Sequence, residues 1–252
     1  QNFSDAMRFG KELLSPGTDG IYELSLSNAA YLSSVKGNAP VSLPVDGAEF
    51  DALLEDIPES ALVIAADGGL RHALSLGLTP DVILGDFDSL GYIPQGAAVF
   101  PVEKDDTDAM LAIRHGLERG CREFMIYGGL DGPRLDHTLA NLQALQFLIG
   151  HGARGYLVGL RQIVTAVTEE TIRFPESAAG ICSLFCLGED AAGVTVTGLQ
   201  YPLRDGRLTS GFPLGVSNHF TGASGTVTVK EGTVIALWDR ENGLPERIPF
   251  VP

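Results

Sequence analysis

The sequence predicts an α/β fold in which a mainly parallel sheet with flanking helices is followed by a C-terminal all-β sandwich. Short apolar runs alternate with helical patterns between about residues 61 and 150, which is typical of a parallel sheet covered by helices. After about Gly155 the helical period disappears, and β-rich runs follow between Gly and Pro residues, as in antiparallel sandwiches. We therefore expect an α/β domain at residues 1–152 and a β-sandwich domain at residues 153–252.

The elements of the first region are separated by Gly- and Asp-containing turns. Strands are predicted at 61–66, 81–84, 97–102 and 123–127, and helices at 70–76, from 108 onward and from about 135 to 150. Thr107 is expected to cap the helix that begins at Asp108, and Gly77 is expected to end the helix before it. In the segment that precedes these elements, residues 21–26 are predicted as a strand and residues 48–54 as a helix.

The second region is predicted to consist of short strands. The β-rich runs lie at 156–160, 163–167, 171–174, 181–187, 194–197, 225–230 and 233–238. Cys182 and Cys186 fall in one of these runs without the spacing of a zinc site, so we expect them to be buried as small apolar residues. Cys121 makes the cysteine count odd, which fits a reducing, cytoplasmic location.

The chain is acidic, with 17 Lys and Arg against 32 Asp and Glu and a net charge of −15 over 252 residues. Residues 1–150 carry most of this charge, because they hold 22 acidic and 9 basic side chains, a net −13. This balance argues against binding to nucleic acids and to anionic membranes, since both require clustered Lys and Arg. An apolar run of the roughly 18 residues that span a bilayer is also missing from the sequence.

Aspartates follow the predicted parallel strands at the points where these strands end. Asp67 follows the first strand, Asp86 and Asp88 follow the second, and Asp131 follows the fourth. Because ligands bind at the carboxyl ends of such strands, we expect these carboxylates to gather at one edge, where a hard cation such as Mg²⁺ would offset their repulsion. The alternative for any single Asp is a turn cap that binds backbone groups.

Glycine pairs and a few basic residues indicate how phosphates could bind there. Gly68-Gly69 and Gly128-Gly129 suit close approach of the backbone to a phosphate chain, although the sequence has neither a GxxxxGK[ST] nor a GxGxxG motif. Lys104 and Arg134 lie in motif turns and are candidates to pair with phosphate oxygens. Arg71 and Arg114 are expected to be solvated on helices.

Two further groups of residues are candidates for ligand binding. His137 follows Asp136, and its two interpretations are a phosphate contact and a structural role. In the β-rich region, Tyr201 could stack on a flat heterocycle, while Ser217 and Asn218 offer hydrogen bonds to its edge. The alternative for these three is a core tyrosine and an ordinary turn.

Taken together, these motifs resemble the thiamine pyrophosphokinase family over about residues 61–238. The resemblance rests on the segments ADGG at 66–69, PD at 80–81, GDFDS at 85–89, KDDTD at 104–108, GG at 128–129, RLDHTLAN at 134–141, GLQYPL at 198–203 and GVSN at 215–218. It implies an α/β catalytic domain, a β-sandwich and a homodimer with its sites at the interface. It also implies Mg²⁺-dependent transfer of a pyrophosphoryl group from ATP to the hydroxyl of thiamine, giving thiamine diphosphate and AMP.

The resemblance assigns roles to particular residues. Asp86, Asp88 and Asp108 would form the metal and catalytic centre. The nucleotide would be held by residues from three of the motifs, namely Asp67, Gly68, Gly69, Lys104, Asp105, Thr107, Arg134, Asp136 and His137. Thiamine would be held by Tyr201, Ser217 and Asn218.

Three other readings share part of this pattern. A pterin diphosphokinase would share the Asp turns without needing the Tyr201 segment. A phosphohydrolase would use Asp86 as a nucleophile and form a phosphoenzyme. A non-catalytic thiamine or nucleotide sensor would be expected to lack the metal centre, whereas this sequence keeps Asp86, Asp88 and Asp108.

Overall fold

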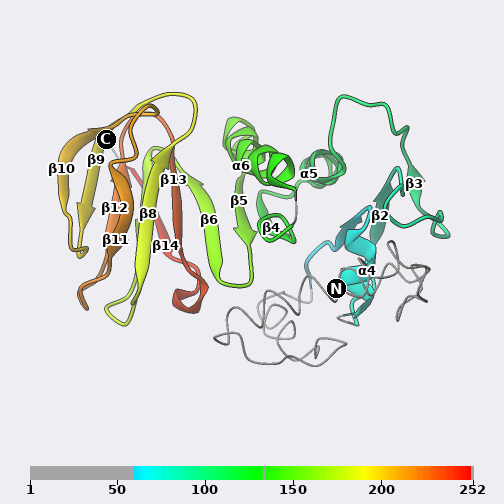
Figure 1. Cartoon of the computed structure of the whole chain (residues 1–252), viewed down its shortest axis with the longest axis horizontal. Helices are drawn as coiled ribbons and strands as arrows, with labels where there is room; N and C mark the ends of the chain where they lie inside the picture. Colours follow the sequence, from blue (N-terminus) through cyan, green and yellow to red (C-terminus); the bar gives the residue numbers. More distant parts are fainter. Residues whose placement is uncertain (1–59, 76, 133, 251–252) are drawn as a thin grey trace, which may run out of the picture. The chain divides into compact units, whose positions relative to one another are not determined.

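The computed structural model describes residues 60–75, 77–132 and 134–250 (Figure 1). The strand predicted at 21–26 and the helix predicted at 48–54 lie outside these residues. The described part contains a small parallel sheet with helices, followed by two larger sheets, so the predicted fold class is confirmed. Among the described residues, no helix combines the length and the apolarity needed to cross a bilayer.

The first sheet has three parallel strands in the order β1-β2-β3. Its strands and the helices next to it in sequence are β1 (Ile64–Ala66), α4 (Gly69–Ser75), β2 (Val82–Gly85), β3 (Ala98–Val99) and α5 (Asp108–Glu118). Helix α5 contacts β1 and β2. Thr107 caps α5 as predicted, because its hydroxyl accepts a hydrogen bond of 3.2 Å from the Met110 backbone amide.

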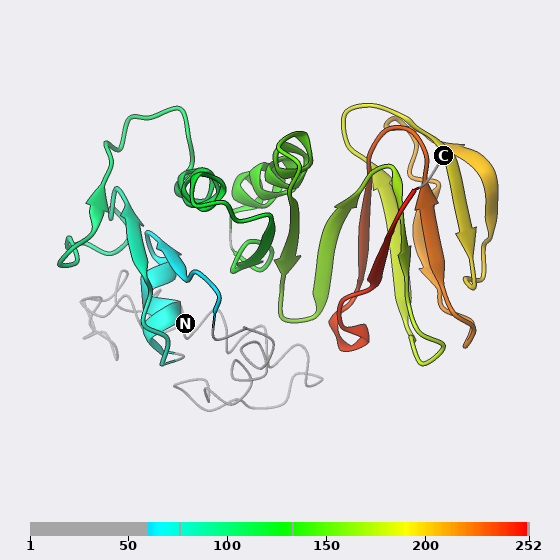
Figure 2. The same ribbon diagram turned by 180° about the vertical axis from the view of Figure 1, so that it is seen from behind.

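The next unit along the chain is β4 (Glu123–Tyr127), α6 (Leu135–Gly150) and β5 (Arg154–Val158). Strands β4 and β5 pair in parallel, and α6 packs on β5 and β6 (Gln162–Val167). Leu145, Leu157 and Val164 are fully or almost fully buried where helix and sheet meet. Helices α5 and α6 lie side by side in Figures 1 and 2 and contact each other.

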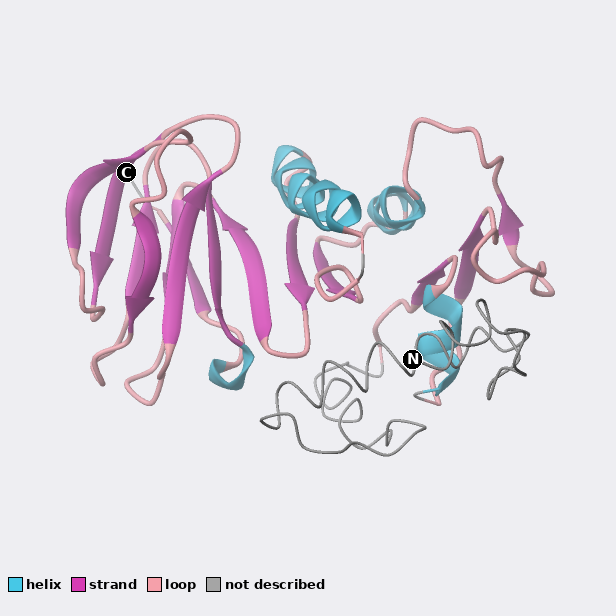
Figure 3. Ribbon diagram, in the orientation of Figure 1, coloured by secondary structure: helices cyan, strands magenta, loops and turns pink. Residues whose placement is uncertain are grey.

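The remaining strands form two mainly antiparallel sheets (magenta in Figure 3). One is the six-stranded sheet in the order β11-β8-β13-β6-β5-β4, and the other is the five-stranded sheet in the order β10-β9-β12-β7-β14. The strands not yet given are β7 (Glu170–Arg173), β8 (Ile181–Cys186), β9 (Ala191–Thr197), β10 (Leu203–Leu208), β11 (Gly215–His219), β12 (Thr226–Val229), β13 (Val234–Asp239) and β14 (Glu246–Pro249). A 3₁₀ turn at Arg240–Asn242 follows β13. The six-stranded sheet therefore contains strands from both sides of residue 152.

The sandwich has an apolar interior with aromatic contacts. The Trp238 side chain is fully buried, its indole N–H donates to the Gly243 carbonyl at 2.8 Å, and its ring meets that of Phe174 edge-on. Strand β12 alternates between buried valines and outer threonines, and Thr228 shares a 2.7 Å hydrogen bond with Thr171 of β7. Cys182 is buried, as predicted, whereas Cys186 and Cys121 are half-buried, and all three thiols are free.

The structure differs from the sequence-based prediction at several strands. The strand predicted at 97–102 is reduced to Ala98–Val99, and both of its residues are exposed. Three strands that the sequence did not predict are β10, β11 and β14. Each of them lies at the edge of a sheet, where one side of the strand has no neighbour and the apolar pattern is weak.

Candidate active site

Two adjacent strand ends bring the first carboxylates together. Ala66 of β1 pairs in register with Leu84 of β2, so the residues that follow the two strands emerge at the same edge of the sheet. The Asp67 amide donates to the Leu84 carbonyl at 2.8 Å. Gly85 has a φ of +146°, and a Cβ there would lie 3.0 Å from the Asp67 nitrogen, so this close approach requires glycine.

The turn after β2 directs two aspartates away from the core. Phe87 has a φ of 62°, and its ring is buried with Ala65, Leu70 and Leu90. The residues on either side of it, Asp86 and Asp88, share a surface with Asp67. One carboxylate oxygen from each of these three aspartates lies within 4.8 Å of the other two.

Lys104 links this group to a fourth aspartate. Its Nζ atom lies 2.5 Å from Asp86 Oδ2 and 3.2 Å from Asp108 Oδ1. Asp108 is the first residue of α5. Asp86 therefore lies both in the group with Asp67 and Asp88 and beside Lys104, whose ammonium joins it to Asp108. Asp67, expected to bind the nucleotide, lies among the carboxylates.

The pKa values of these groups respond to one another. The hydrogen bond from Lys104 lowers the pKa of Asp86. Burial raises the pKa of Asp108, and the nearby charges of Asp86 and Asp67 add to this while Lys104 opposes it. Burial acts to lower the pKa of Lys104, but its interactions with the Asp86 and Asp108 carboxylates outweigh burial and raise it.

The carboxylates are not fully satisfied within the protein. Oδ1 of Asp67 and Oδ1 of Asp108 are buried and accept no hydrogen bond, although the latter has the Lys104 ammonium 3.2 Å away. Oδ2 of Asp67 accepts a 2.5 Å hydrogen bond from the Ser89 hydroxyl. Hard oxygen ligands with free lone pairs and an excess of negative charge are the donor set that Mg²⁺ takes, so these residues fit such an ion.

Sequence reasoning missed two residues that shape this turn. Ser89 orients Asp67, and its place at the end of the GDFDS segment was the available signal. Arg71, expected to be solvated, instead donates from one nitrogen to the carbonyls of Ser89 and Leu90 at 3.1 and 3.0 Å. Arg114 is exposed, as expected, and pairs with Asp106 at 3.0 Å.

Asp131 does not join the carboxylate group. Its Oδ2 accepts a 2.8 Å hydrogen bond from the Leu160 amide, so it caps the turn between β5 and β6. For this aspartate the alternative reading, a turn cap, holds.

The other predicted nucleotide residues lie at helix starts and in turns. Arg134 donates from Nε and Nη2 to the Asp136 carboxylate at 3.2 and 2.6 Å, and both side chains are exposed. This pairing lowers the pKa of Asp136 and raises that of Arg134, to which the charge of Asp88 also contributes. His137 follows at the start of α6, and its backbone amide also bonds the Asp136 carboxylate.

The remaining four are placed by α4 and α5. Gly68 and Gly69 form the turn into α4, and a Cβ at Gly68 would lie 2.9 Å from the Ser89 hydroxyl. The Thr107 hydroxyl serves as the cap of α5, and Asp105 is exposed in the preceding turn.

The predicted thiamine residues form a second group, on the sandwich. The Asn218 side chain is buried and donates to the Tyr201 carbonyl at 2.8 Å, while its oxygen accepts from the Tyr201 amide at 2.9 Å. Tyr201 itself is 63 % exposed. Ser217 has a φ of 57°, and its amide donates to the Ser183 hydroxyl at 2.9 Å. Asn218 thus holds the backbone that presents Tyr201, a role that the sequence did not indicate.

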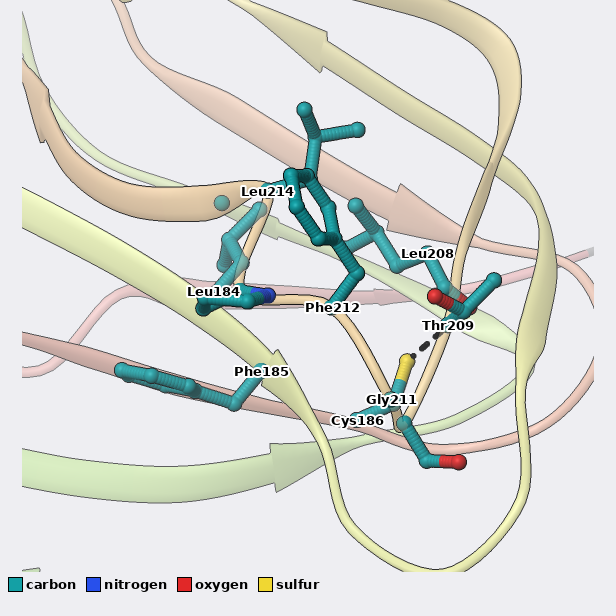
Figure 4. A pocket seen from close by; sticks show the side chains of 11 residues that line it. Leu184, Phe185, Cys186, Leu208, Thr209, Gly211, Phe212 and Leu214 are labelled. Atoms are coloured by element: carbon teal, nitrogen blue, oxygen red, sulfur yellow. Dashed lines mark hydrogen bonds between the residues drawn. The ribbon is translucent and has the colours of Figure 1, made fainter.

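A hollow of about 140 Å³ lies elsewhere on the sandwich, between β8 and the chain from β10 to β11 (Figure 4). Figure 4 shows Phe212, Leu214 and Leu184 around it, and the Cys186 thiol donates to the Leu208 carbonyl at 3.2 Å. Its lining has no carboxylate and no basic side chain, so it lacks the groups that phosphoryl transfer needs.

Two family models match the chain. The model described as the catalytic domain of thiamin pyrophosphokinase matches residues 54–154, and the one described as its vitamin B1 binding domain matches residues 169–234. A thiamine pyrophosphokinase of Bacillus subtilis is 31 % identical over an alignment of 189 residues that covers 71 % of this chain and 87 % of the relative. The chain belongs to the thiamine pyrophosphokinase family.

Solved structures of thiamine pyrophosphokinases resemble the chain in fold. The B. subtilis crystal structure has a TM-score of 0.66 at 27 % identity and covers 74 % of this chain and 91 % of its own. For the structure from Geobacillus thermodenitrificans the TM-score is 0.63 at 26 % identity, with 77 % and 93 % covered. The Candida albicans structure, at 15 % identity and a TM-score of 0.59 with 72 % and 82 % covered, shares the fold.

The two matched ranges divide the candidate residues of this thiamine pyrophosphokinase family member. The catalytic-domain range contains the carboxylates, Lys104 and the start of α6, and the vitamin B1 binding range contains Tyr201, Ser217 and Asn218. Strand β14, which pairs with β7 in the five-stranded sheet, lies beyond both ranges.

Proposed function

We propose that this chain transfers the pyrophosphoryl group of ATP to the hydroxyl of thiamine in a Mg²⁺-dependent reaction, giving thiamine diphosphate and AMP. The observation that carries the proposal is the group of Asp67, Asp86 and Asp88, joined to Asp108 through Lys104, in which Asp67 keeps a buried oxygen without a hydrogen bond. Such a group favours a divalent cation together with the phosphates that complete its coordination. Family membership supports thiamine and ATP as the substrates.

In this proposal Asp86, Asp88 and Asp108 hold Mg²⁺, with Asp67 beside them. When bound, Mg²⁺ polarises the phosphate oxygens and stabilises negative charge on the leaving group. The nucleotide is held by the turns and helix starts described above, namely by Asp67, Gly68, Gly69, Lys104, Asp105, Thr107, Arg134, Asp136 and His137. Their task is positioning, because phosphoryl-type transfer asks the protein for alignment and charge stabilisation more than for covalent help.

The reaction balances without a further reagent. The thiamine oxygen forms a bond to the β-phosphorus, the bond from this phosphorus to the oxygen bridging it to the α-phosphorus breaks, and AMP leaves with that oxygen. The hydroxyl proton is released as the new bond forms. Thiamine carries a fixed positive charge, which the acidic surface of the catalytic region favours. We assign its binding to Tyr201, Ser217 and Asn218.

We further propose that these tasks divide between residues 1–152, which bind ATP and Mg²⁺, and residues 153–252, which bind thiamine. The enzyme would act as a homodimer with its sites at the interface. Phe212, Leu214 and Val216, which are exposed next to and on an edge strand, support an association between copies. Three free thiols support a cytoplasmic location.

A direct assay tests the activity. Purified protein is incubated with ATP, Mg²⁺ and thiamine, and the nucleotide products are separated. We expect AMP and thiamine diphosphate in equal amounts, and no product when EDTA removes the metal. Formation of ADP, or product from a pterin alcohol and not from thiamine, would reject the proposal. Sedimentation of the same sample tests the homodimer.

A further inference from the structure

Lys104 places a positive charge where carboxylates would otherwise repel one another. Its ammonium lies 2.5 Å from Asp86 Oδ2 and 3.2 Å from Asp108 Oδ1. The exposed fractions of these side chains are 13 % for Lys104, 8 % for Asp86 and 22 % for Asp108. Because the three groups are largely shielded from water, their interaction is stronger than that of a surface ion pair.

One ammonium does not balance this site. Asp67, Asp86, Asp88 and Asp108 supply four carboxylates, and Lys104 contacts two of them. Oδ1 of Asp108 lies 3.2 Å from the ammonium, whereas the buried Oδ1 of Asp67 accepts no hydrogen bond. Lys104 therefore offsets part of the repulsion and leaves the remaining charge for a ligand.

Its position in the chain allows Lys104 to move independently of its partners. Asp108 is held in the first turn of α5, which the Thr107 hydroxyl caps. Lys104 precedes this helix, in a loop, and its ammonium is a compact charge on a flexible stem. It can leave the carboxylates while they stay in place.

We propose that Lys104 is a tethered counter-ion that occupies the carboxylate site without a divalent cation and competes with the cation for Asp86 and Asp108. This inference rests on the metal centre of the proposed function. When both aspartates coordinate the cation, Lys104 has to give up these contacts, and its ammonium becomes available to the phosphates of the nucleotide. The residue thus keeps the cation-free site folded at the expense of cation affinity.

Direct binding of Mn²⁺ tests the competition, with no nucleotide and no thiamine present. Free Mn²⁺ is measured by electron paramagnetic resonance for the unmodified protein and for Lys104→Met. Loss of a positive charge a few ångströms from the cation is expected to tighten Mn²⁺ binding by about tenfold or more. Equal or weaker binding by this variant would overturn the proposal.

Two control variants separate charge from other effects. Lys104→Arg keeps a positive charge and is expected to bind Mn²⁺ within about threefold of the unmodified protein. Lys230→Met removes an exposed lysine paired with Asp205 at 2.7 Å on the sandwich, and it is expected to leave the affinity unchanged. If Lys230→Met tightened binding as much as Lys104→Met, net charge would be the cause and the proposal would fail.

Thermal unfolding with EDTA and with saturating Mn²⁺ gives a second readout. Lys104→Met is expected to have a lower Tm in EDTA and a larger rise in Tm with Mn²⁺ than the unmodified protein. A variant that folds only with Mn²⁺ supports the counter-ion role, whereas a variant that folds in neither condition shows a purely structural role and overturns it. Because no substrate is present, a failed thiamine assay would reject the proposed activity and leave this result standing. Absence of Mn²⁺ binding by the unmodified protein would reject the metal centre itself.

Discussion

The α/β part and the sandwich differ in whether their buried polar groups make hydrogen bonds. In the sandwich, the buried polar side chains of the described residues all make hydrogen bonds, and these are Thr165, Ser183 and Asn218. The described residues of the α/β part contain three buried side-chain atoms without a hydrogen bond, in Asp67, Asp108 and His115, and of these the Asp108 oxygen lies 3.2 Å from the Lys104 ammonium. An unsatisfied buried polar atom costs free energy. The comparison therefore indicates that the sandwich is arranged for stability and the α/β part for holding a ligand.

The largest effect on stability is expected from Trp238→Ala. The indole is fully buried, packs edge-on against Phe174 and donates to the Gly243 carbonyl. Its removal leaves a cavity and an unpaired carbonyl, so the free energy of unfolding should fall by about 3–5 kcal/mol. Urea denaturation followed by circular dichroism measures this loss.

Phe250→Ala is the matched control, because Phe250 is an aromatic residue of the same region that is 40 % exposed. This variant should stay within about 0.5 kcal/mol of the unmodified protein. Equal losses from the two variants would contradict the view that the sandwich interior supplies the stability.

Asp88→Asn should reduce enzymatic activity without reducing the stability of the fold. This change removes one charge from the carboxylate group while keeping the size of the side chain. Turnover of ATP and thiamine should fall at least about a hundredfold, or about 2.7 kcal/mol, because charge stabilisation at the metal is lost. Stability should be unchanged or higher, since repulsion between the carboxylates is reduced.

Asp205→Asn provides the control, as Asp205 is an exposed aspartate that pairs with Lys230 on the sandwich. Its turnover should equal that of the unmodified protein. Full activity of Asp88→Asn would show that Asp88 does not belong to the metal centre.

Ser89→Ala should have a smaller effect. The Ser89 hydroxyl donates to Asp67 Oδ2 at 2.5 Å, so its loss frees the carboxylate to rotate. We expect kcat/KM for ATP to fall about tenfold, or about 1.4 kcal/mol, with Ser177→Ala, an exposed serine of the sandwich, as the control.

The same variant distinguishes the two roles open to Asp67. If Asp67 contacts the nucleotide, KM for ATP should rise while the affinity for Mn²⁺ stays the same. If Asp67 is a metal ligand, Mn²⁺ binding should weaken as well. Unchanged kinetics and unchanged Mn²⁺ binding would show that the hydrogen bond has no functional part.

The strands in the middle of a sheet were predicted well from the sequence, because a strand that is buried on both faces consists of a run of apolar residues. Strands β6, β8 and β13 lie in the middle of their sheet and were predicted from apolar runs. Strand β10, with the sequence LRDGRL, and β14, with ERIP, lie at edges and gave no such run. An edge strand is specified by its partner's backbone more than by its own side chains.

The candidate site shows a similar division. The aspartates were predictable because their turns follow apolar strands and the topology of parallel strands places such turns together. Two sets of hydrogen bonds were not predictable. Arg71 donates to the Ser89 and Leu90 carbonyls, and the Asn218 side chain bonds the backbone of Tyr201. These bonds join residues about 17 to 19 positions apart in the sequence, and the partners come within bonding distance only once the chain has folded.

The smallest expected effect concerns the cysteines, and it tests the rigidity of the sandwich. Burial raises the pKa of the Cys182 thiol to about 12, and the Asp239 carboxylate adds to this. At pH 8 about one such thiol in ten thousand is ionised, and the thiolate is the reactive form. Labelling of the native protein with iodoacetamide, read by mass spectrometry, should therefore leave Cys182 unmodified while the half-buried Cys121 of the α/β part reacts. In denaturant all three cysteines should react alike, which controls for the reagent. Native labelling of Cys182 as fast as that of Cys121 would mean that the sandwich opens as readily as the α/β part, and the division of stability between the two regions would be wrong.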